Sequence, residues 1–134
     1  MKRRPLGNSG MDLPELTLGT WLTFSTAHQD TANALVAAAF DAGIDAFDTA
    51  DVYGMRDGER ALAVALRGRA RDSYFLASKV FFPMSDAPED RGLSRATSWI
   101  PSTAVWGGSK PTISTSTNAT ASTPRFRWRK PSRP

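Results

Sequence analysis

Two stretches of the chain place apolar residues three or four positions apart, which predicts two amphipathic helices. The first starts at Asp30 or Thr31, either of which suits the cap of a first turn, and it ends at Gly43. Its apolar side carries Leu35, Val36, Ala39 and Phe40. The second starts at Asp57-Gly58 and ends near Gly68. Its apolar side carries Leu62, Ala65 and Leu66.

Short runs of strand-forming residues lie before, between and after the two helices. They span residues 15–18, 44–47 and 74–78. Ahead of them, the turn-rich segment 7–10 lies between Leu6 and Leu13-Pro14, which predicts a short hairpin. Because strands and helices alternate, we expect right-handed crossovers and a parallel sheet, the arrangement of an α/β fold.

Length and composition limit what this fold can be. A chain of 134 residues is long enough for one small domain and too short for most complete cofactor enzymes. Cysteine is absent, so disulfides, thiolate zinc sites and a cysteine nucleophile are excluded. No apolar run is long enough to cross a membrane, and the basic start is not followed by a signal-peptide core, so we expect a cytoplasmic protein.

The charge is distributed unevenly along the chain. The net charge of +4 comes from 17 basic and 13 acidic residues, and by itself it suggests a nucleic-acid or membrane partner. The distribution of the charge argues otherwise, so we expect no clear nucleic-acid or membrane partner. Residues 1–95 hold every acidic residue and carry a net charge of −2, whereas residues 96–134 hold six basic residues and no acidic one. We therefore expect a folded part, residues 1–95, followed by an irregular or disordered Ser/Thr/Pro-rich basic tail, residues 96–134.

Chemically capable side chains follow the ends of the predicted strands, where ligands gather in parallel sheets. They are Gly19-Thr20-Trp21, Asp48, Tyr53 and Lys79. A phenol has a pKa of about 10 in water, so tyrosine is a useful proton donor at neutral pH only where its anion is stabilised. A lysine near the hydroxyl supplies that stabilisation, and a carboxylate holds the lysine in place. On spacing alone, a solvated aspartate, a tyrosine at the core edge and a surface lysine remain the alternative.

Four short motifs occur in a fixed order: RPLGNSG from Arg4, LGTW from Leu18, FDTADVYG from Phe47 and ASKV from Ala77. Together they resemble the aldo/keto reductases over about residues 2–95, and the opening motif resembles the branch that includes the potassium-channel β-subunit-like members. That family forms a (β/α)8 barrel and uses NADPH to reduce aldehydes and ketones, or NADP to oxidise alcohols. The resemblance implies the N-terminal portion of a (β/α)8 TIM barrel, about three strands and two helices. It also implies a small carbonyl or alcohol substrate, NADP(H) and no metal.

Carried over position by position, the resemblance implies a role for each motif residue. Tyr53 would be the general acid that protonates the carbonyl oxygen. Lys79 would stabilise the anion of Tyr53, and Asp48 would pair with Lys79. The residues implied to bind the cofactor are Gly19, Thr20, Trp21 and Asp48, and Trp21 would also form a wall of the substrate pocket.

The chain departs from the family in two respects. The family's fourth catalytic residue is a histidine at the end of the fourth strand, yet no histidine follows Lys79, and we expect His28 to be a loop or cap residue. The family's phosphate and adenine contacts lie mostly in the second half of the barrel. Because a barrel needs about 250 residues, the chain resembles a truncated fragment whose third strand has an unpaired edge. We expect it to be partly folded or aggregation-prone, and inactive by itself.

Residues 96–134 allow three interpretations. Residues 112–120 have the composition of a disordered Ser/Thr segment, and residues 124–130 that of a basic aromatic patch for nucleic acid or lipid. The third interpretation is a frameshift or a misplaced splice junction near Arg95. In a displaced reading frame, each codon joins the third base of one codon to the first two bases of the next. For the codons of residues 97–123, one translation compatible with the given amino acids is IMDSIDRSLGRLKTDYLDLYQCHRFD. Its first part has helical periodicity, and its second part resembles the family's next strand, including the missing histidine.

Two classes of function remain open from the sequence. One is an NADP(H)-dependent aldo/keto reductase, and the other is a non-enzymatic product whose basic aromatic tail binds nucleic acid or membrane, or which acts as a decoy subunit. Salt-sensitive nucleic-acid binding that is lost on removal of residues 124–134 would favour the second class. A small autonomous nucleotide-binding domain is disfavoured because no glycines form a GxGxxG or GxxxxGK[ST] phosphate loop.

Overall fold

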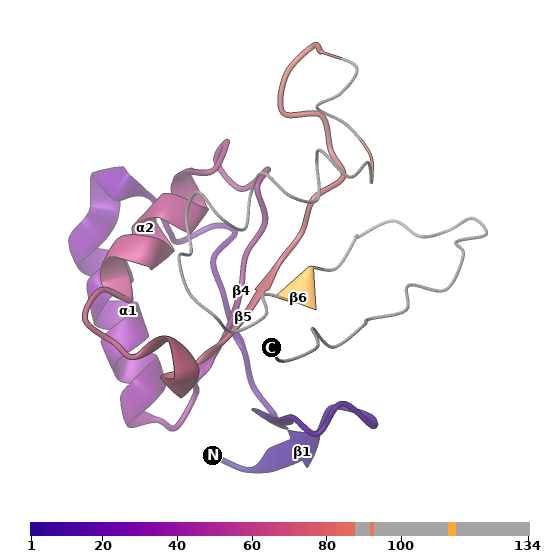
Figure 1. The fold of residues 1–134 in the computed structure, drawn as a ribbon. Helices are drawn as coiled ribbons and strands as arrows, with labels where there is room; N and C mark the ends of the chain where they lie inside the picture. The colour runs from indigo at the N-terminus through magenta and orange to yellow at the C-terminus, as the bar shows by residue number, and fades with distance from the viewer. Residues whose placement is uncertain (88–91, 93–112, 115–134) are drawn as a thin grey trace, which may run out of the picture.

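The computed structural model describes residues 1–87, 92 and 113–114 (Figure 1). Its strands are β1 (Arg3–Pro5), β2 (Asp12–Pro14), β3 (Leu18–Gly19), β4 (Ala46–Asp48), β5 (Phe75–Ser78) and β6 (Ile113–Ser114). Its α-helices are α1 (Gln29–Asp41) and α2 (Asp57–Ala65), and its short 3₁₀ helices are η1 (Thr26–His28) and η2 (Arg71–Ser73). The alternation of strands and helices that the apolar pattern predicts is therefore present.

The main sheet has the order β3-β4-β5-β6, and all of its strands are parallel. Phe47 of β4 pairs with both Leu18 of β3 and Leu76 of β5. Each connection between parallel strands needs a crossover, and α1 and α2 supply two of them. The parallel α/β sheet expected from the sequence is confirmed.

Both helices cover the same side of this sheet (Figure 1). Phe47 and Leu76, side by side on neighbouring strands, are almost completely buried there, and Ser78 is buried two residues further along β5. Val36 of α1 and Leu62 of α2 belong to the same buried cluster. The predicted apolar sides of both helices therefore form the core together with alternate residues of the strands.

The start of α1 differs from the one that the sequence predicts. This helix begins at Gln29 rather than at Asp30 or Thr31, His28 occupies the capping position, and no side chain caps the first turn. The carboxylate of Asp57, at the start of α2, instead accepts hydrogen bonds from the backbone N–H (2.9 Å) and the hydroxyl (2.7 Å) of Thr26. The expected cap by Asp30 or Thr31 was wrong. This region is anchored by a contact between Thr26 and Asp57, which are 31 residues apart, and not by a local cap.

The predicted hairpin is confirmed and lies against the amino ends of the central strands. β1 pairs with β2 in antiparallel register. The guanidinium of Arg3 donates to both carboxylate oxygens of Asp45, each at 3.0 Å, and Asp45 immediately precedes β4. The hairpin therefore covers the end of the sheet opposite the predicted site.

The outer edge of β5 is paired, which corrects one expectation. β6 lies beside β5 in parallel register, with Ala77 opposite Ile113 and Ser78 opposite Ser114 (Figure 1). The predicted unpaired edge was wrong here because the chain returns to the sheet within the segment expected to be an irregular tail. The other residues of the predicted tail, apart from 113–114, lie outside the described part of the chain.

Candidate active site

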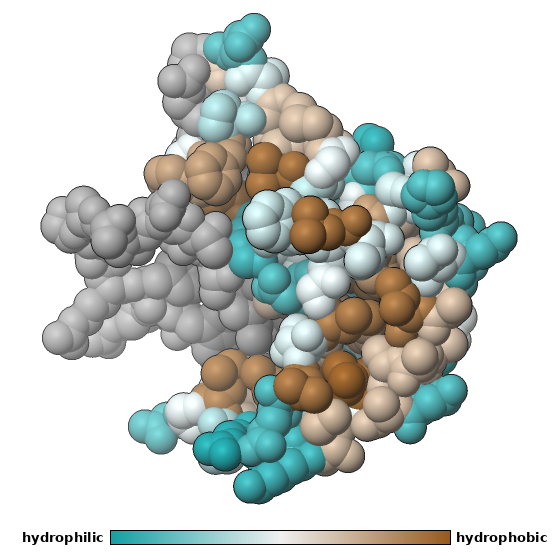
Figure 2. Space-filling view, turned by 180° about the vertical axis from the view of Figure 1, so that it is seen from behind, coloured by the Kyte–Doolittle hydropathy of each residue, from teal (hydrophilic) through white to brown (hydrophobic). Residues whose placement is uncertain are grey.

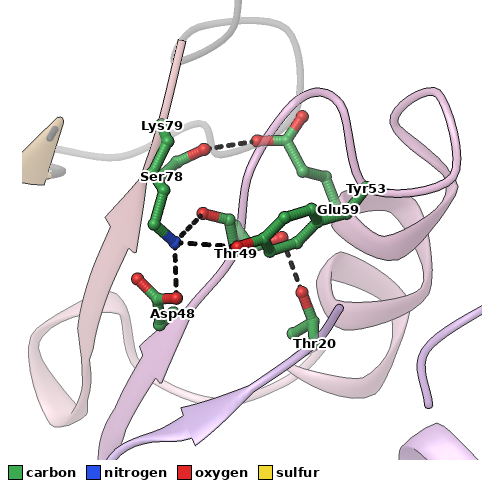
Figure 3. A network of polar contacts seen from close by, with 7 residues as sticks. All are labelled: Thr20, Asp48, Thr49, Tyr53, Glu59, Ser78 and Lys79. Carbon is green, nitrogen blue, oxygen red and sulfur yellow. Dashed lines mark hydrogen bonds and ion pairs between the residues drawn. The ribbon is translucent and has the colours of Figure 1, made fainter. Parts of the chain in front are cut away.

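The candidate site lies where β4 and β5 end, as the sequence predicts (Figure 3). Asp48 is the last residue of β4, and Lys79 directly follows β5. Beyond the strands, the backbone N–H of Thr49 donates to the carbonyl of Ala77 at 2.8 Å, and that of Asp51 donates to the carbonyl of Lys79 at 3.1 Å. The sheet pairing thus continues into the loop and fixes the two backbones that carry the site.

The ammonium group of Lys79 has three oxygen partners at this point. It donates to Oδ2 of Asp48 at 2.5 Å, to the backbone carbonyl of Thr49 at 3.1 Å and to the hydroxyl of Tyr53 at 3.2 Å. The Lys79 side chain is only 12% exposed. The structure therefore brings the three predicted catalytic residues together, and a lysine has three N–H donors to satisfy all three contacts.

This arrangement leaves the phenol able to donate a proton. The hydroxyl oxygen of Tyr53 accepts a hydrogen bond from Lys79, so its own O–H remains available for a further partner. A fixed positive charge beside the oxygen stabilises the anion that forms when that proton leaves. Chemically, the site is suited to give a proton to an oxygen atom placed near Tyr53.

The loop that carries Tyr53 has an unusual backbone. Gly54, Met55 and Arg56 all adopt positive φ angles, of 58°, 53° and 71°. The turn is held by a hydrogen bond from the N–H of Arg56 to the carbonyl of Asp51 at 2.7 Å. Non-glycine residues rarely adopt this conformation unless the surrounding contacts impose it. The loop therefore presents Tyr53 to the site and starts α2 immediately afterwards.

Gly19 is the last residue of β3, and Thr20 and Trp21 follow it beside the same cluster. The N–H of Thr20 donates to the carbonyl of Asp48 at 3.0 Å, and its buried hydroxyl donates to the hydroxyl of Thr49 at 2.8 Å. The ring of Trp21 stacks on that of Tyr53 with centroids 6.1 Å apart, yet 69% of Trp21 is exposed. The buried side chain of Thr20 therefore anchors this segment, while Trp21 offers a flat aromatic surface next to Tyr53.

One buried polar pair near the site was not predicted. Glu59 of α2 is completely buried, and its Oε1 accepts a hydrogen bond from the hydroxyl of Ser78 at 2.7 Å (Figure 3). Glu59 lies three residues before Leu62 and seven before Leu66, so it falls on the apolar side of α2. An acidic residue on a predicted apolar side was the signal that could have identified it.

Two aspartates near the site titrate away from the ordinary carboxyl pKa of 3.8. Burial raises the pKa of Asp51, and the hydrogen bond from Val52 and the charge of Arg56 partly offset that effect. Asp57 has the opposite shift, because the hydroxyl and N–H of Thr26 stabilise its carboxylate and lower its pKa. Stability is therefore expected to depend on pH through two groups with opposite signs.

The described residues contain neither a metal-binding cluster nor a membrane-spanning helix. No three His, Cys, Asp or Glu side chains among them come together as a metal ion would require. None of the helices in this part of the chain is both long and apolar enough to cross a membrane.

Comparison with known proteins identifies the family. Residues 15–103, more than half of the chain, match the aldo/keto reductase family. A probable voltage-gated potassium channel subunit beta of Oryza sativa subsp. japonica is 36% identical over 98 residues, which cover 71% of this chain and 30% of that protein. The chain therefore spans about a third of the length of this relative.

Solved structures show the same relationship. An aldo-keto reductase from Bacillus halodurans in its holo form has a TM-score of 0.58 and 31% identity, over 67% of this chain and 29% of its own. A thermostable aldo-keto reductase in complex with the inhibitor epalrestat has a TM-score of 0.56 and 29% identity, over 60% of this chain and 31% of its own. The described elements thus form an N-terminal portion of a (β/α)8 barrel, and the chain belongs to the aldo/keto reductase family.

Proposed function

We propose that the chain supplies the N-terminal part of an NADP(H)-dependent aldo/keto reductase, whose complete barrel transfers hydride between a nicotinamide and a small aldehyde, ketone or alcohol. The observation that carries this proposal is the convergence of Lys79 Nζ on Asp48 and Tyr53, at 2.5 and 3.2 Å. Membership of the aldo/keto reductase family supports the same class of reaction.

The three clustered residues have distinct tasks in this proposal. When bound, NADPH supplies the hydride that reaches the carbonyl carbon. Tyr53 donates its hydroxyl proton to the carbonyl oxygen, so the product leaves as a neutral alcohol. Lys79 stabilises the phenolate that remains, and Asp48 keeps the ammonium turned toward Tyr53. In the direction of alcohol oxidation, the phenolate of Tyr53 accepts the proton.

The residues assigned to the cofactor are Gly19, Thr20, Trp21 and Asp48. They fit the nicotinamide end, because the exposed ring of Trp21 provides a flat surface beside Tyr53. A Cβ added to Gly19 would meet no heavy atom within 4 Å, so space is open above the end of β3. Thr20 acts by anchoring this segment to Thr49.

We propose that the 134-residue chain does not turn over substrate by itself. It spans about a third of the length of its relatives, and its only histidine, His28, is at the capping position of α1 and does not directly follow a strand. Proton donation by Tyr53 also requires a substrate held in place, and most of the barrel that would hold it is outside this sequence.

We further propose that the message beyond about codon 95 encodes the next strand of the barrel in a reading frame displaced by one base, which we call the displaced register. The position of β6 supports this proposal, since Ile113–Ser114 lie parallel to β5 where a following barrel strand belongs. The codons of Ile113 and Ser114 belong to the stretch that reads DYLDLY in the displaced register, a pattern suited to a strand. The change from a net charge of −2 to +6 near residue 95 fits a change of register as well.

Sequencing the message across codons 90–100 tests the register directly. A one-base discrepancy or an unspliced junction in that window is the expected result. Translation that continues in the displaced register beyond that window, which we call the corrected register, gives a protein that should oxidise NADPH when given a small aldehyde. The 134-residue chain should not. An intact message, with no family-like sequence in the displaced register, would overturn the register proposal. An inactive, folded protein in the corrected register would overturn the proposed function.

A further inference from the structure

We propose that Glu59 is a positioning residue for Lys79 and acts through Ser78. The inference rests on the proposed function of Lys79 and concerns how α2 holds that side chain in place. Glu59 is 0% exposed and Ser78 is 4% exposed, and the Ser78 hydroxyl donates to Glu59 Oε1 at 2.7 Å. Ser78 is the last residue of β5 and the direct neighbour of Lys79.

Two hydrogen bonds hold the end of β5, one at the Ser78 side chain and one at the Lys79 carbonyl. The Ser78 side chain is tied to α2 through Glu59, while the carbonyl of Lys79 accepts a hydrogen bond from the N–H of Asp51 at 3.1 Å. Figure 3 shows the Ser78 and Lys79 side chains leaving the strand toward different partners. Fixing the backbone at both points determines where the long Lys79 side chain starts, and hence whether its ammonium reaches Asp48 and Tyr53 together.

The chemistry of Glu59 favours a positioning role over simple packing. Glu59 lies on the apolar side of α2, beside Leu62 and Leu66, and faces the sheet. A leucine or methionine would suit this position better, because burying a carboxyl group is costly. A hydrogen bond between a hydroxyl and a carboxyl oxygen is directional and holds its two groups at a defined separation. Such a bond specifies the position of Ser78 more closely than an apolar contact would.

Lysine acetylation measures this position without any need for turnover. The chain has four lysines, and Lys2, with a side chain 73% exposed, serves as the internal reference. In the full 134-residue chain, acetic anhydride should label Lys79 more slowly than Lys2, because Lys79 is buried and hydrogen-bonded. In Glu59→Ala the Lys79 to Lys2 labelling ratio should rise roughly fivefold, the size expected when one hydrogen bond is lost.

Two further variants separate the hydrogen bond from the bulk of the side chain. Ser78→Ala should raise the same ratio as much as Glu59→Ala does. Glu59→Gln keeps a side-chain carbonyl that can accept from Ser78, so its ratio should stay within about twofold of the parent. If Glu59→Gln behaves like Glu59→Ala, or if Ser78→Ala has no effect, the proposal is wrong.

Leu62→Ala is the matched control for lost stability. Leu62 lies one turn along α2, is fully buried, and belongs to the apolar cluster. Labelling is compared at temperatures where Glu59→Ala and Leu62→Ala have equal helical circular dichroism. An equal rise in Lys79 labelling in both would show a purely structural role and sink the proposal. Because no substrate is used, failure of the proposed function would leave this comparison unchanged.

Discussion

Asp51 is a buried carboxyl group within the loop that carries Tyr53, and burial raises its pKa above 3.8. The folded state therefore holds this proton more tightly than the unfolded chain does. The resulting stabilisation is present below the unfolded pKa and is lost as the pH rises through the folded pKa. The protonated carboxyl of Asp51 therefore favours the folded state more than the ionised form does.

Asp51→Asn should raise the midpoint of thermal unfolding at pH 7, because the amide carries no charge and its oxygen can still accept a hydrogen bond. The gain should shrink toward zero as the pH falls below about 4, where aspartate is protonated in both states. Circular dichroism melts across this pH range provide the measurement. Asp86→Asn, at an exposed position, is the matched control, and a gain at Asp51 that does not vary with pH would contradict the explanation.

The residues of the candidate site could be predicted from sequence to different extents. Asp48, Tyr53 and Lys79 were identifiable because each follows a strand and belongs to a motif, and the structure brings them together. The Glu59 and Ser78 pair was missed because each residue was assigned to an element by the apolar pattern around it. Only the packing of α2 against β5 shows that the two polar groups face each other.

At the scale of elements, the contact between Thr26 and Asp57 connects η1 to the start of α2. Hydrogen bonds from Thr26 lower the pKa of Asp57, so the stabilisation is present above the unfolded pKa and is lost as the pH falls through the folded value. The Asp57 carboxylate also lies at a helix N-terminus, where negative charge is favourable.

Thr26→Val removes the hydroxyl donor and keeps the backbone N–H. The pKa of Asp57, followed by carbon-detected NMR, should move back toward 3.8, and the acid-induced loss of helical signal should begin at a higher pH. Thr31→Val, at an exposed position of α1, should change neither quantity. A Thr26→Val protein with an unchanged Asp57 titration would show that the hydroxyl does not cause the shift.

The elements themselves were predicted more accurately than their ends. Apolar spacing identified α1 and α2, because that spacing is a property of each helix alone. The start of α1 was wrong because Thr26 and Asp57, 31 positions apart, anchor that region. β6 was not predicted in the printed sequence because a two-residue strand has no periodicity and depends on the edge of β5 that it pairs with.

At the scale of the whole molecule, the described chain is a segment of a barrel wall. Several large apolar side chains around the strand ends and loops remain exposed. They include Trp21, Leu22, Met55, Phe81 and Phe82. On the face shown in Figure 2, apolar areas are separated by polar ones. Exposed apolar groups of this kind are expected where further chain would cover them, which is the basis for predicting that the isolated chain is partly folded or aggregation-prone.

The central claim is that Tyr53, supported by Lys79 and Asp48, is the proton donor of an aldo/keto reductase. Its most direct test is the rate of NADPH-dependent aldehyde reduction by the protein expressed in the corrected register, compared with its Tyr53→Phe variant. Phenylalanine keeps the ring that stacks on Trp21 and removes only the hydroxyl. We predict a loss of turnover of roughly 10²- to 10⁴-fold with unchanged folding. Equal rates in the two proteins would contradict the claim.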